Sequence, residues 1–511
     1  MKDEDNLLKK EKRKKRDKIL EEGIDPYPHV YKKENNSLDL SHTYKNLKEG
    51  DASSEKCSLA GRVMRKRDMG KAAFFNIQDE QGEFQCYIKK EDFSNITTKD
   101  NSWSVWKLTD IGDIVGLCGI VFRTKKGELS LRVQELKILC KTLENLPEKY
   151  HGIEDKEIKY RYRHLDLIMD AESRKTFKIR SQIISEIRKY MEQKSFMEVE
   201  TPVLQPIYGG AVAMPFKTYF RRLESDMYLK ISPEIYLKKL IVGGFEKVYE
   251  IGKNFRNEGI DRTHNPEFTM MEYYEAYTDY EYQMNQFEDL VCHVVQKIKG
   301  SLKFKYQDKE IDFSKPWKRI SIKEAVQEYG QMNIDTSSYE DLLKKIKQLK
   351  PEEDFKKFEK VESSKQAAFK EELIMLIYEA TAEKKLWQPT FVKDFPLSVS
   401  PLTKKHRQAS SDKNYERIVE RFEPIIAGME VGNAYTELND PVDQKERLEN
   451  QNRTSEEDTS HPMDQNFIHA IEVGMPPTGG VGLGIERLVM ILTDKSSIRD
   501  SMLFPILKTK A

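Results

Sequence analysis

The sequence predicts an α+β protein of more than one domain, with a small N-terminal β-barrel and a larger domain of mixed strands and helices. The first observation is a series of five short β-type runs between residues 57 and 142. The second is that longer helical and strand patterns alternate beyond residue 170. A chain of 511 residues accommodates both domains, since one domain contains roughly 100 to 200 residues.

Composition excludes several classes of protein. Lys plus Arg and Asp plus Glu are 86 each, so the net charge is zero and any nucleic-acid site must be local. The five cysteines are widely spaced and none forms a Cys-x-x-Cys pair, which argues against a disulfide framework and a structural zinc site. No apolar run approaches the ~18 residues of a membrane span, and the N-terminus has no signal-peptide core. We expect a cytoplasmic protein with reduced thiols and no membrane partner.

Residues 1–56 are predicted to form a basic helical extension. Residues 9–18 contain eight Lys and Arg, and the pattern breaks at Gly23-Ile24-Asp25-Pro26. Two interpretations remain open. The segment is either a solvated terminal helix or an electrostatic contact to a nucleic-acid backbone.

Residues 57–145 are predicted to form a closed barrel of the OB-fold type. Turn signals at Gln81-Gly82 and Lys126-Gly127 separate some of its strands. The strand runs are Ser58–Met64, Ala72–Gln78, Phe84–Ile88, Asp113–Phe122 and Leu129–Cys140. Basic residues between positions 62 and 71 lie close to Phe74 and Phe75, as in barrels that stack single-stranded bases. The alternative is that both phenylalanines belong to the barrel core and the basic residues to an exposed loop.

Residues 146–172 are interpreted as a linker and residues 173–511 as the second domain. An amphipathic helix is expected over Ser173–Lys194, followed by a strand over Met197–Glu200 that Pro202 stops. The Lys/Glu-rich stretch 339–382 is expected to be helical, without chemistry of its own. Further strands are expected at Phe245–Glu258, Glu267–Tyr277 and Glu423–Leu438.

The chemistry is expected on these three strands. Because side chains alternate along a strand, Arg256 and Glu258 point to one side, next to a polar loop over residues 259–265. In the next strand a carboxylate, Glu272, shares a face with aromatic residues, which is costly unless a cation meets it. That face comprises Phe268, Met270, Glu272 and Tyr274.

The third strand repeats this pattern. Asn433, Tyr435 and Glu437 share a face with Val431, and the acids Glu423 and Glu430 flank Gly428. A structural ion pair explains any single acid, but it explains poorly a set that recurs on three strands. The pattern therefore favours an acidic pocket with aromatic walls, suited to a cationic ligand and to magnesium.

A glycine-rich run, Gly480 to Gly484, precedes Glu486 and Arg487 at the start of an apolar helix. Glycines two apart leave one face of a strand without side chains, so a flat ring can approach the backbone. The run is not a P-loop, since no Gly-Lys-Ser/Thr follows at the required spacing.

Together these residues resemble the three signature motifs of class II aminoacyl-tRNA synthetases. Motif 1 is similar to the helix leading to Phe196–Pro202, motif 2 to Phe255–Glu258 with its loop and Phe268, and motif 3 to Gly482–Arg487. Within the class, five blocks resemble the lysyl-tRNA synthetases. They are Gly209–Ala211, Pro233–Leu237, Phe255–Tyr277, Tyr435–Pro441 and Met475–Thr478. The resemblance implies an OB-fold anticodon-binding domain and a catalytic domain built on an antiparallel sheet flanked by helices.

The resemblance also implies an ATP site. Arg256, Glu258 and Arg487 would be catalytic: Arg256 would hold the α-phosphate, and Glu258 would contact an adenine stacked between Phe268 and Arg487. Glu423 and Glu430 would hold Mg²⁺. The complete ATP set implied is Arg256, Glu258, His264, Asn265, Phe268, Glu423, Glu430 and Arg487.

For the amino acid, the resemblance implies a lysine site with Glu437 and Tyr274 at the ε-ammonium. The complete set is Gly210, Glu234, Arg256, Glu272, Tyr274, Asn433, Tyr435 and Glu437. Anticodon readout on tRNA(Lys) would fall to Arg67, Phe74, Gln85 and Glu128 in the barrel. Motif 1 would build a homodimer interface.

Three rival readings remain. An aspartyl- or asparaginyl-tRNA synthetase shares these motifs, but its pocket would need a basic side chain where this chain has Glu234, Glu272 and Glu437. A lysyl transferase that modifies a protein resembles only the catalytic domain. A non-catalytic synthetase-like regulator would lack motif residues that are present here. One departure from the lysyl pattern is Glu486, where that family usually carries Asp.

Overall fold

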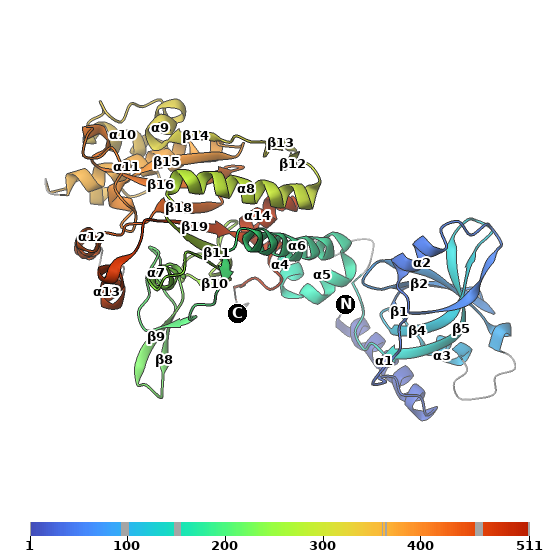
Figure 1. Ribbon diagram of the computed structural model, residues 1–511. Coiled ribbons are helices and arrows are strands. Elements are labelled where there is room, and N and C mark those ends of the chain that lie inside the picture. Colours follow the sequence, from blue (N-terminus) through green and yellow to red (C-terminus); the bar gives the residue numbers. More distant parts are fainter. Residues whose placement is uncertain are drawn as a thin grey trace. The chain divides into compact units, whose positions relative to one another are not determined.

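The computed structural model describes residues 2–93, 102–147, 155–359, 361–362, 365–454 and 463–508, in two compact units, Met1–Gly152 and Ile153–Ala511 (Figure 1). The elements of the first unit are α1 (Lys2–Glu21), α2 (Ser37–Thr43), β1 (Ala52–Asp68), β2 (Ala72–Gln78), β3 (Glu83–Lys89), α3 (Ser102–Leu108), β4 (Ile114–Arg123) and β5 (Leu129–Cys140).

The first part of the second unit contains α4 (Lys156–Arg161), α5 (Arg163–Met169), α6 (Ala171–Gln193), β6 (Met197–Glu198), β7 (Leu204–Gln205), β8 (Lys217–Phe220), β9 (Ser225–Leu229), α7 (Glu234–Val242), β10 (Lys247–Phe255), β11 (Glu267–Ala276), α8 (Tyr280–Lys299), β12 (Lys303–Tyr306), β13 (Lys309–Asp312) and β14 (Lys318–Ser321). The remainder contains α9 (Ile322–Gly330), α10 (Tyr339–Leu349), α11 (Gln366–Thr381), β15 (Thr390–Pro396), β16 (Ile418–Ile426), β17 (Met429–Glu430), β18 (Gly432–Thr436), α12 (Pro441–Thr454), α13 (Gln465–Gly474), β19 (Thr478–Gly484) and α14 (Ile485–Leu492). Helices α4 and α5 thus occupy part of the stretch interpreted as a linker.

The N-terminal strands close into a five-stranded barrel in the order β1-β2-β3-β5-β4, which confirms the predicted strands. Strict alternation along β2 buries Phe75 and turns Phe74 outward. Sequence analysis did not predict α3, which supplies Trp106 to the core with its ring 4.4 Å from that of Phe75. Of the two phenylalanines, only Phe75 belongs to the barrel core.

The predicted basic helix is present as α1 and packs on the barrel through some of its lysines. Lys12 is buried and donates hydrogen bonds to the carbonyl oxygens of Glu144 (2.9 Å) and Ile111 (3.4 Å). Lys15 pairs with Asp110, and Lys9 Nζ lies 2.7 Å from Glu144 Oε2. Part of the basic charge therefore has a structural role within this unit.

A nine-stranded sheet forms the frame of the second unit, in the order β14-β15-β16-β18-β19-β11-β10-β6, with β17 paired to β16. The strands run antiparallel except at the two ends of the order, where β14 pairs with β15 and β6 with β10 in parallel. The predicted single strand Glu423–Leu438 is wrong. Ala427 and Gly428 have φ of 53° and 69° and reverse the chain, so the stretch contains the end of β16, then β17 and β18.

One face of this sheet is apolar and packs on helices. Met271, Tyr273 and Leu483 point into a core that also contains residues of α6, α8 and α14. Along β15 the neighbours Phe391 and Val392 enter different cores, because α9, α10 and α11 form a second cluster around that end of the sheet. Over the central strands the opposite face is left for polar residues.

No described helix is long and apolar enough to cross a membrane. All five cysteines have free thiols, none joined in a disulfide.

Replacement of Lys141 by Met should destabilise the barrel strongly. Lys141 is fully buried, and its Nζ lies 2.7 Å from the buried carboxylate of Asp113. Removing one partner of a buried ion pair leaves the other charge uncompensated, at a cost of about 3–5 kcal/mol. Hydrogen exchange of β4 and β5 peptides in the full-length protein measures the opening free energy. The exposed Lys137→Met on β5, the strand that ends just before Lys141, is the control, and equal protection in both variants would contradict the prediction.

Candidate active site

A cavity of about 460 Å³ opens on the polar face of the second unit's sheet. It brings together almost all of the site residues expected in this unit. Its lining includes Gly210, Glu234, Arg256, Glu258, His264, Asn265, Phe268, Glu272, Tyr274, Glu423, Glu430, Asn433, Tyr435 and Arg487. Glu437 is not part of the lining and lies fully buried behind it.

One part of the cavity is cationic and aromatic. The Arg256 guanidinium lies 5.1 Å from the ring centre of Phe268, and its Nε is buried with no hydrogen-bond acceptor among the described residues. Asp261 holds the loop between β10 and β11 by accepting hydrogen bonds from the backbone N–H groups of Thr263 (2.6 Å) and His264 (2.8 Å). The geometry suits an anion that receives the unused Arg256 donor.

Helix α14 fixes the second arginine of this region. Glu486 is buried, and its two carboxylate oxygens accept hydrogen bonds from the backbone N–H of Thr269 at 3.1 and 3.0 Å. Arg180 also donates to Glu486 at 2.8 Å. Arg487 on the next position donates to the Glu430 carbonyl oxygen and lies 3.5 Å from His264 Nε2. Glu486 therefore ties motif 3 to β11 and places Arg487 at the cavity.

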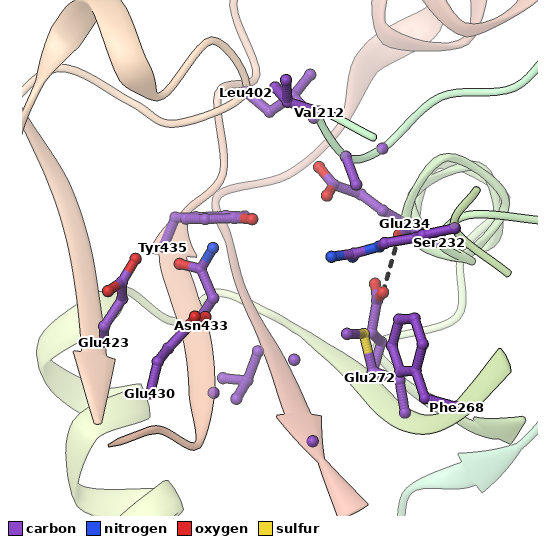
Figure 2. Close-up of a pocket in the computed structure, with 18 of the residues that line it drawn as sticks. Val212, Ser232, Glu234, Phe268, Glu272, Leu402, Glu423, Glu430, Asn433 and Tyr435 are labelled. Atoms are coloured by element: carbon purple, nitrogen blue, oxygen red, sulfur yellow. Dashed lines mark hydrogen bonds between the residues drawn. The ribbon is translucent and has the colours of Figure 1, made fainter. Parts of the chain in front are cut away.

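Glu423 and Glu430 form an acidic group at the cavity, and Figure 2 shows them on the opposite side of the view from Glu234 and Glu272. Burial raises the pKa of Glu423 to about 8, with Arg421 opposing the shift and Glu430 adding to it. Among the described residues no three His, Cys, Asp or Glu side chains are arranged to hold a metal. Two carboxylates nevertheless fit Mg²⁺, which keeps several waters and takes further oxygens from bound phosphates.

Glu234 and Glu272 line the other acidic part of the cavity (Figure 2). Ser232 donates a hydrogen bond to Glu272 Oε1 at 2.8 Å, and the Tyr274 hydroxyl donates to Oε2 at 3.2 Å. Burial, followed by the nearby Glu234 charge, raises the pKa of Glu272 to about 8. Gly210 has φ of +87°, and a Cβ there would meet the Glu234 Cβ at 2.9 Å. Glycine is thus required at this wall.

Sequence analysis missed two internal cations of the site. Lys238 Nζ is fully buried, 2.6 Å from Glu234 Oε1 and 2.5 Å from Glu437 Oε2. Arg421 lines the cavity and donates hydrogen bonds to Asn433 Oδ1 (3.1 Å) and Ser400 Oγ (3.0 Å). Their spacing was a usable signal, since Lys238 follows Glu234 by one helical turn and Arg421 alternates in phase with Glu423.

The glycines of β19 leave one face of the strand without side chains, and part of that face is filled from within the protein. A Cβ on Gly480 would lie 2.0 Å from Glu437 Oε1 and 2.5 Å from Tyr274 Cε1. Gly482 and Gly484 remain part of the cavity lining. The missing side chains therefore make room for a buried carboxylate at one end of the strand and leave the other end open to the cavity.

The barrel residues expected to read an anticodon lie on the outer side of the first unit. Arg67 on β1 is in register with Phe74 on β2, and Phe74 with Tyr87 on β3, whose ring lies 4.8 Å from that of Phe74. Gln85 shares the Tyr87 face and donates to Ser130 Oγ at 2.7 Å. Glu128 is exposed just before β5. Tyr87, which the sequence did not single out, lies against Phe74 with the two rings tilted by 44°.

Comparison with known proteins adds an independent line of support. Residues 155–508 match the family described as tRNA synthetases class II (D, K and N), and residues 57–139 match the OB-fold nucleic acid binding domain. A lysine–tRNA ligase of Clostridium novyi is 45% identical over 98% of this chain and 95% of its own length. One from Methanoculleus marisnigri is 45% identical over 96% of this chain and 93% of its own length.

One from Thermoanaerobacter pseudethanolicus is 44% identical over 99% of this chain and 97% of its own length. The family matches and these relatives agree with the predicted OB-fold barrel, and with a second domain built on a sheet flanked by helices. The chain belongs to the class II tRNA synthetases of the D, K and N group and, within that group, to the lysine–tRNA ligase family.

Proposed function

We propose that the chain activates L-lysine with ATP to form lysyl-adenylate and pyrophosphate, and then transfers lysine to the 3′ end of tRNA(Lys). The observation that carries this proposal is a single cavity that joins an arginine-rich end to a second end lined by the buried carboxylates Glu234 and Glu272. The first end suits a nucleoside triphosphate. The second suits an amino acid with more than one ammonium group.

ATP is assigned to the first end of the cavity. Arg256, with its free buried Nε, would bind the α-phosphate, and Phe268 and Arg487 would stack the adenine that Glu258 contacts. His264 and Asn265 would lie beside the nucleotide. Glu423 and Glu430 would hold Mg²⁺, which neutralises phosphate charge when it is bound.

The chemical step needs no side-chain nucleophile. A carboxylate oxygen of lysine attacks the α-phosphorus, a new P–O bond forms, and the bond to the pyrophosphate leaving group breaks. Negative charge on the α-phosphate oxygens grows during this step, and the Arg256 guanidinium is placed to stabilise it. The terminal ribose 3′-hydroxyl of tRNA then attacks the lysyl carbonyl and displaces AMP.

Lysine is assigned to the carboxylate end. Glu234 and Glu272, beside Gly210, would take the α-ammonium group, and Arg256 would approach the carboxylate. The ε-ammonium would extend toward Tyr274 and Glu437, with Asn433 and Tyr435 completing the walls. Glu437 Oε1 is buried and accepts no hydrogen bond from any described residue, so it keeps an open acceptor. A neutral side chain would leave such an acceptor unpaired, which is a strong basis for rejection.

The rival readings fit these observations less well. An aspartate or asparagine pocket needs an unpaired cation toward the side chain, whereas here Lys238 is already paired with Glu234 and Glu437, and Glu272 adds a third carboxylate. A non-catalytic regulator does not need Arg256, Glu430 and Arg487 at one cavity. A protein-modifying lysyl transferase does not need the barrel. The free cysteines suit the reducing cytoplasm, where we place this activity.

Pyrophosphate exchange with ATP and Mg²⁺, run with each of the twenty amino acids and without tRNA, tests this function. We expect exchange with lysine alone. Arg256→Ala should lower the rate by roughly 100-fold or more, because a buried donor to the transition state is lost. The exposed Arg222→Ala is the control. Exchange with aspartate or asparagine would refute the assignment, and so would the absence of exchange with all twenty amino acids.

We propose that the barrel binds the anticodon of tRNA(Lys) through Arg67, Phe74, Gln85 and Glu128. Phe74→Ala should raise the KM for tRNA roughly 5- to 150-fold, since stacking one base contributes about 1–3 kcal/mol. Lysine-dependent pyrophosphate exchange by the same variant should stay at the wild-type rate. An unchanged KM for tRNA would remove Phe74 from the interface.

We also propose a homodimer built on motif 1. Strand β6 ends the order of the main sheet, its Met197 is 40% exposed, and the exposed Val203 (44%) and Leu204 (51%) follow a few residues later in the chain. Such a concentration of exposed apolar surface is typical of an interface. Light scattering at micromolar concentration should give twice the chain mass of 59.9 kDa. A monomer at that concentration would contradict the proposal.

A further inference from the structure

Lys238 occupies an unusual position for a lysine. Its ammonium group is fully buried in the second unit, between Glu234 on its own helix and Glu437 at the end of β18. The ion-pair distances are 2.6 and 2.5 Å, and the Phe467 ring lies 5.8 Å from Nζ. A buried ammonium with two carboxylate partners is held in one place, because any movement would leave a charge without its partner.

Charged and titratable groups face this ammonium and its two partners from four elements. Helix α7 contributes Glu234, β11 contributes Glu272 and Tyr274, β16 contributes Arg421, and the β18 segment contributes Tyr435 and Glu437. Arg421 makes its own ion pair with Glu423 at the other end of the cavity. Lys238 is therefore the internal cation that is shared by the carboxylates of the amino-acid end.

A charge count shows what Lys238 changes. Glu234, Glu272 and Glu437 carry three negative charges when ionised, and Lys238 cancels one of them. Two negative charges remain, and lysine brings two ammonium groups. In a buried site an unmatched charge is far more costly than in water. The two remaining negative charges therefore favour binding of an amino acid with two ammonium groups over one with a single ammonium group.

We propose that Lys238 is a positioning residue for lysine recognition, whose ammonium holds Glu234 and Glu437 in place and sets the amino-acid end at two uncompensated negative charges. The inference rests on the proposed function and adds a specificity-determining role for a residue outside the cavity lining. Lys238 touches neither substrate. It acts through the two carboxylates that it pairs with.

The direction of the pH effect follows from the same geometry. Burial acts to lower the pKa of Lys238, but Glu234 and Glu437 outweigh it and raise that pKa, so Lys238 stays charged. Burial raises the pKa of Glu437 to about 8, and Lys238 opposes this shift. Without Lys238 nothing on this side offsets the effect of burial on the carboxylate pKa, so the carboxylates keep their protons to higher pH. Lysine, whose side-chain pKa is near 10.4, would then have to displace those protons.

The test compares Lys238→Met, Lys238→Arg and the control Lys239→Met, a half-buried lysine on the same helix. Lysine KM and ATP KM are measured by pyrophosphate exchange between pH 6.5 and 9.5, and L-lysine binding by titration calorimetry. In wild type the lysine KM should fall as pH rises toward about 8, because the carboxylates ionise. We call the pH at which this fall is half complete the pH midpoint of the lysine KM. In Lys238→Met the pH midpoint should rise by about one unit or more, which gives a roughly tenfold higher lysine KM at pH 7.

Two further results keep the proposal falsifiable. The double variant Lys238→Met/Glu437→Gln restores two net negative charges at the amino-acid end of the cavity. Its pH midpoint should therefore return toward the wild-type value, although its affinity for lysine is lower. Lys238→Arg should keep the wild-type midpoint. ATP KM should stay unchanged in all of them. If Lys238→Met fails to fold, the double variant and Lys238→Arg carry the comparison.

A lysine KM that is unchanged in Lys238→Met, or raised by the same factor at every pH, overturns the proposal. The same holds if the double variant keeps the midpoint of the single one. Failure of the proposed function is distinguishable from these outcomes, because wild-type protein would then show no exchange with lysine at any pH.

Discussion

Burial of one face of the central sheet against α6, α8 and α14 is the constraint on which the site depends. The side chains of Met271 and Tyr273 on β11 and of Leu483 on β19 are buried in that core. Because side chains alternate, this burial turns Glu272, Tyr274 and the β19 glycines toward the cavity. A shift of one residue in either strand would exchange the two faces and bury the charges in the apolar core.

The cavity itself is an arrangement of charges that are compensated inside the protein. Several buried carboxylates at or beside the cavity have a cationic partner: Glu423 has Arg421, Glu486 has Arg180, and Glu437 has Lys238. Glu272 differs, since the hydrogen bonds that it accepts from the described residues come from the hydroxyl groups of Ser232 and Tyr274. Hydroxyl groups offset less of the desolvation cost than a cation does, so Glu272 is the carboxylate that gains most from a cationic ligand.

Much of this could be predicted from sequence because it depends on local periodicity. The barrel strands, the phase of β11, and the glycine face of β19 all follow from a period of two. The hairpin at Ala427–Gly428 was missed because the end of β16, β17 and β18 follow one another so closely that their residues resemble one continuous strand. Lys238 and Arg421 were missed for another reason. A Lys in a helix or an Arg in a strand is usually solvated, and their spacing alone does not show that these two are buried; the packing of α7 on β10 and β11 and the ion pair with Glu437 do so for Lys238.

Gly480 has a consequence for how such a pocket can change over evolutionary time. The wall beside Glu437 is backbone, and even a methyl group there would overlap a carboxylate oxygen and an aromatic ring. A substitution therefore cannot change the shape of this wall gradually, because glycine has no side chain to shorten and any added side chain overlaps its neighbours. New ligand preferences must arise through α7, β11 and β18 together, where each replaced charge also removes the partner of another. A protein that keeps glycine at this position is therefore expected to keep the same class of ligand as it evolves.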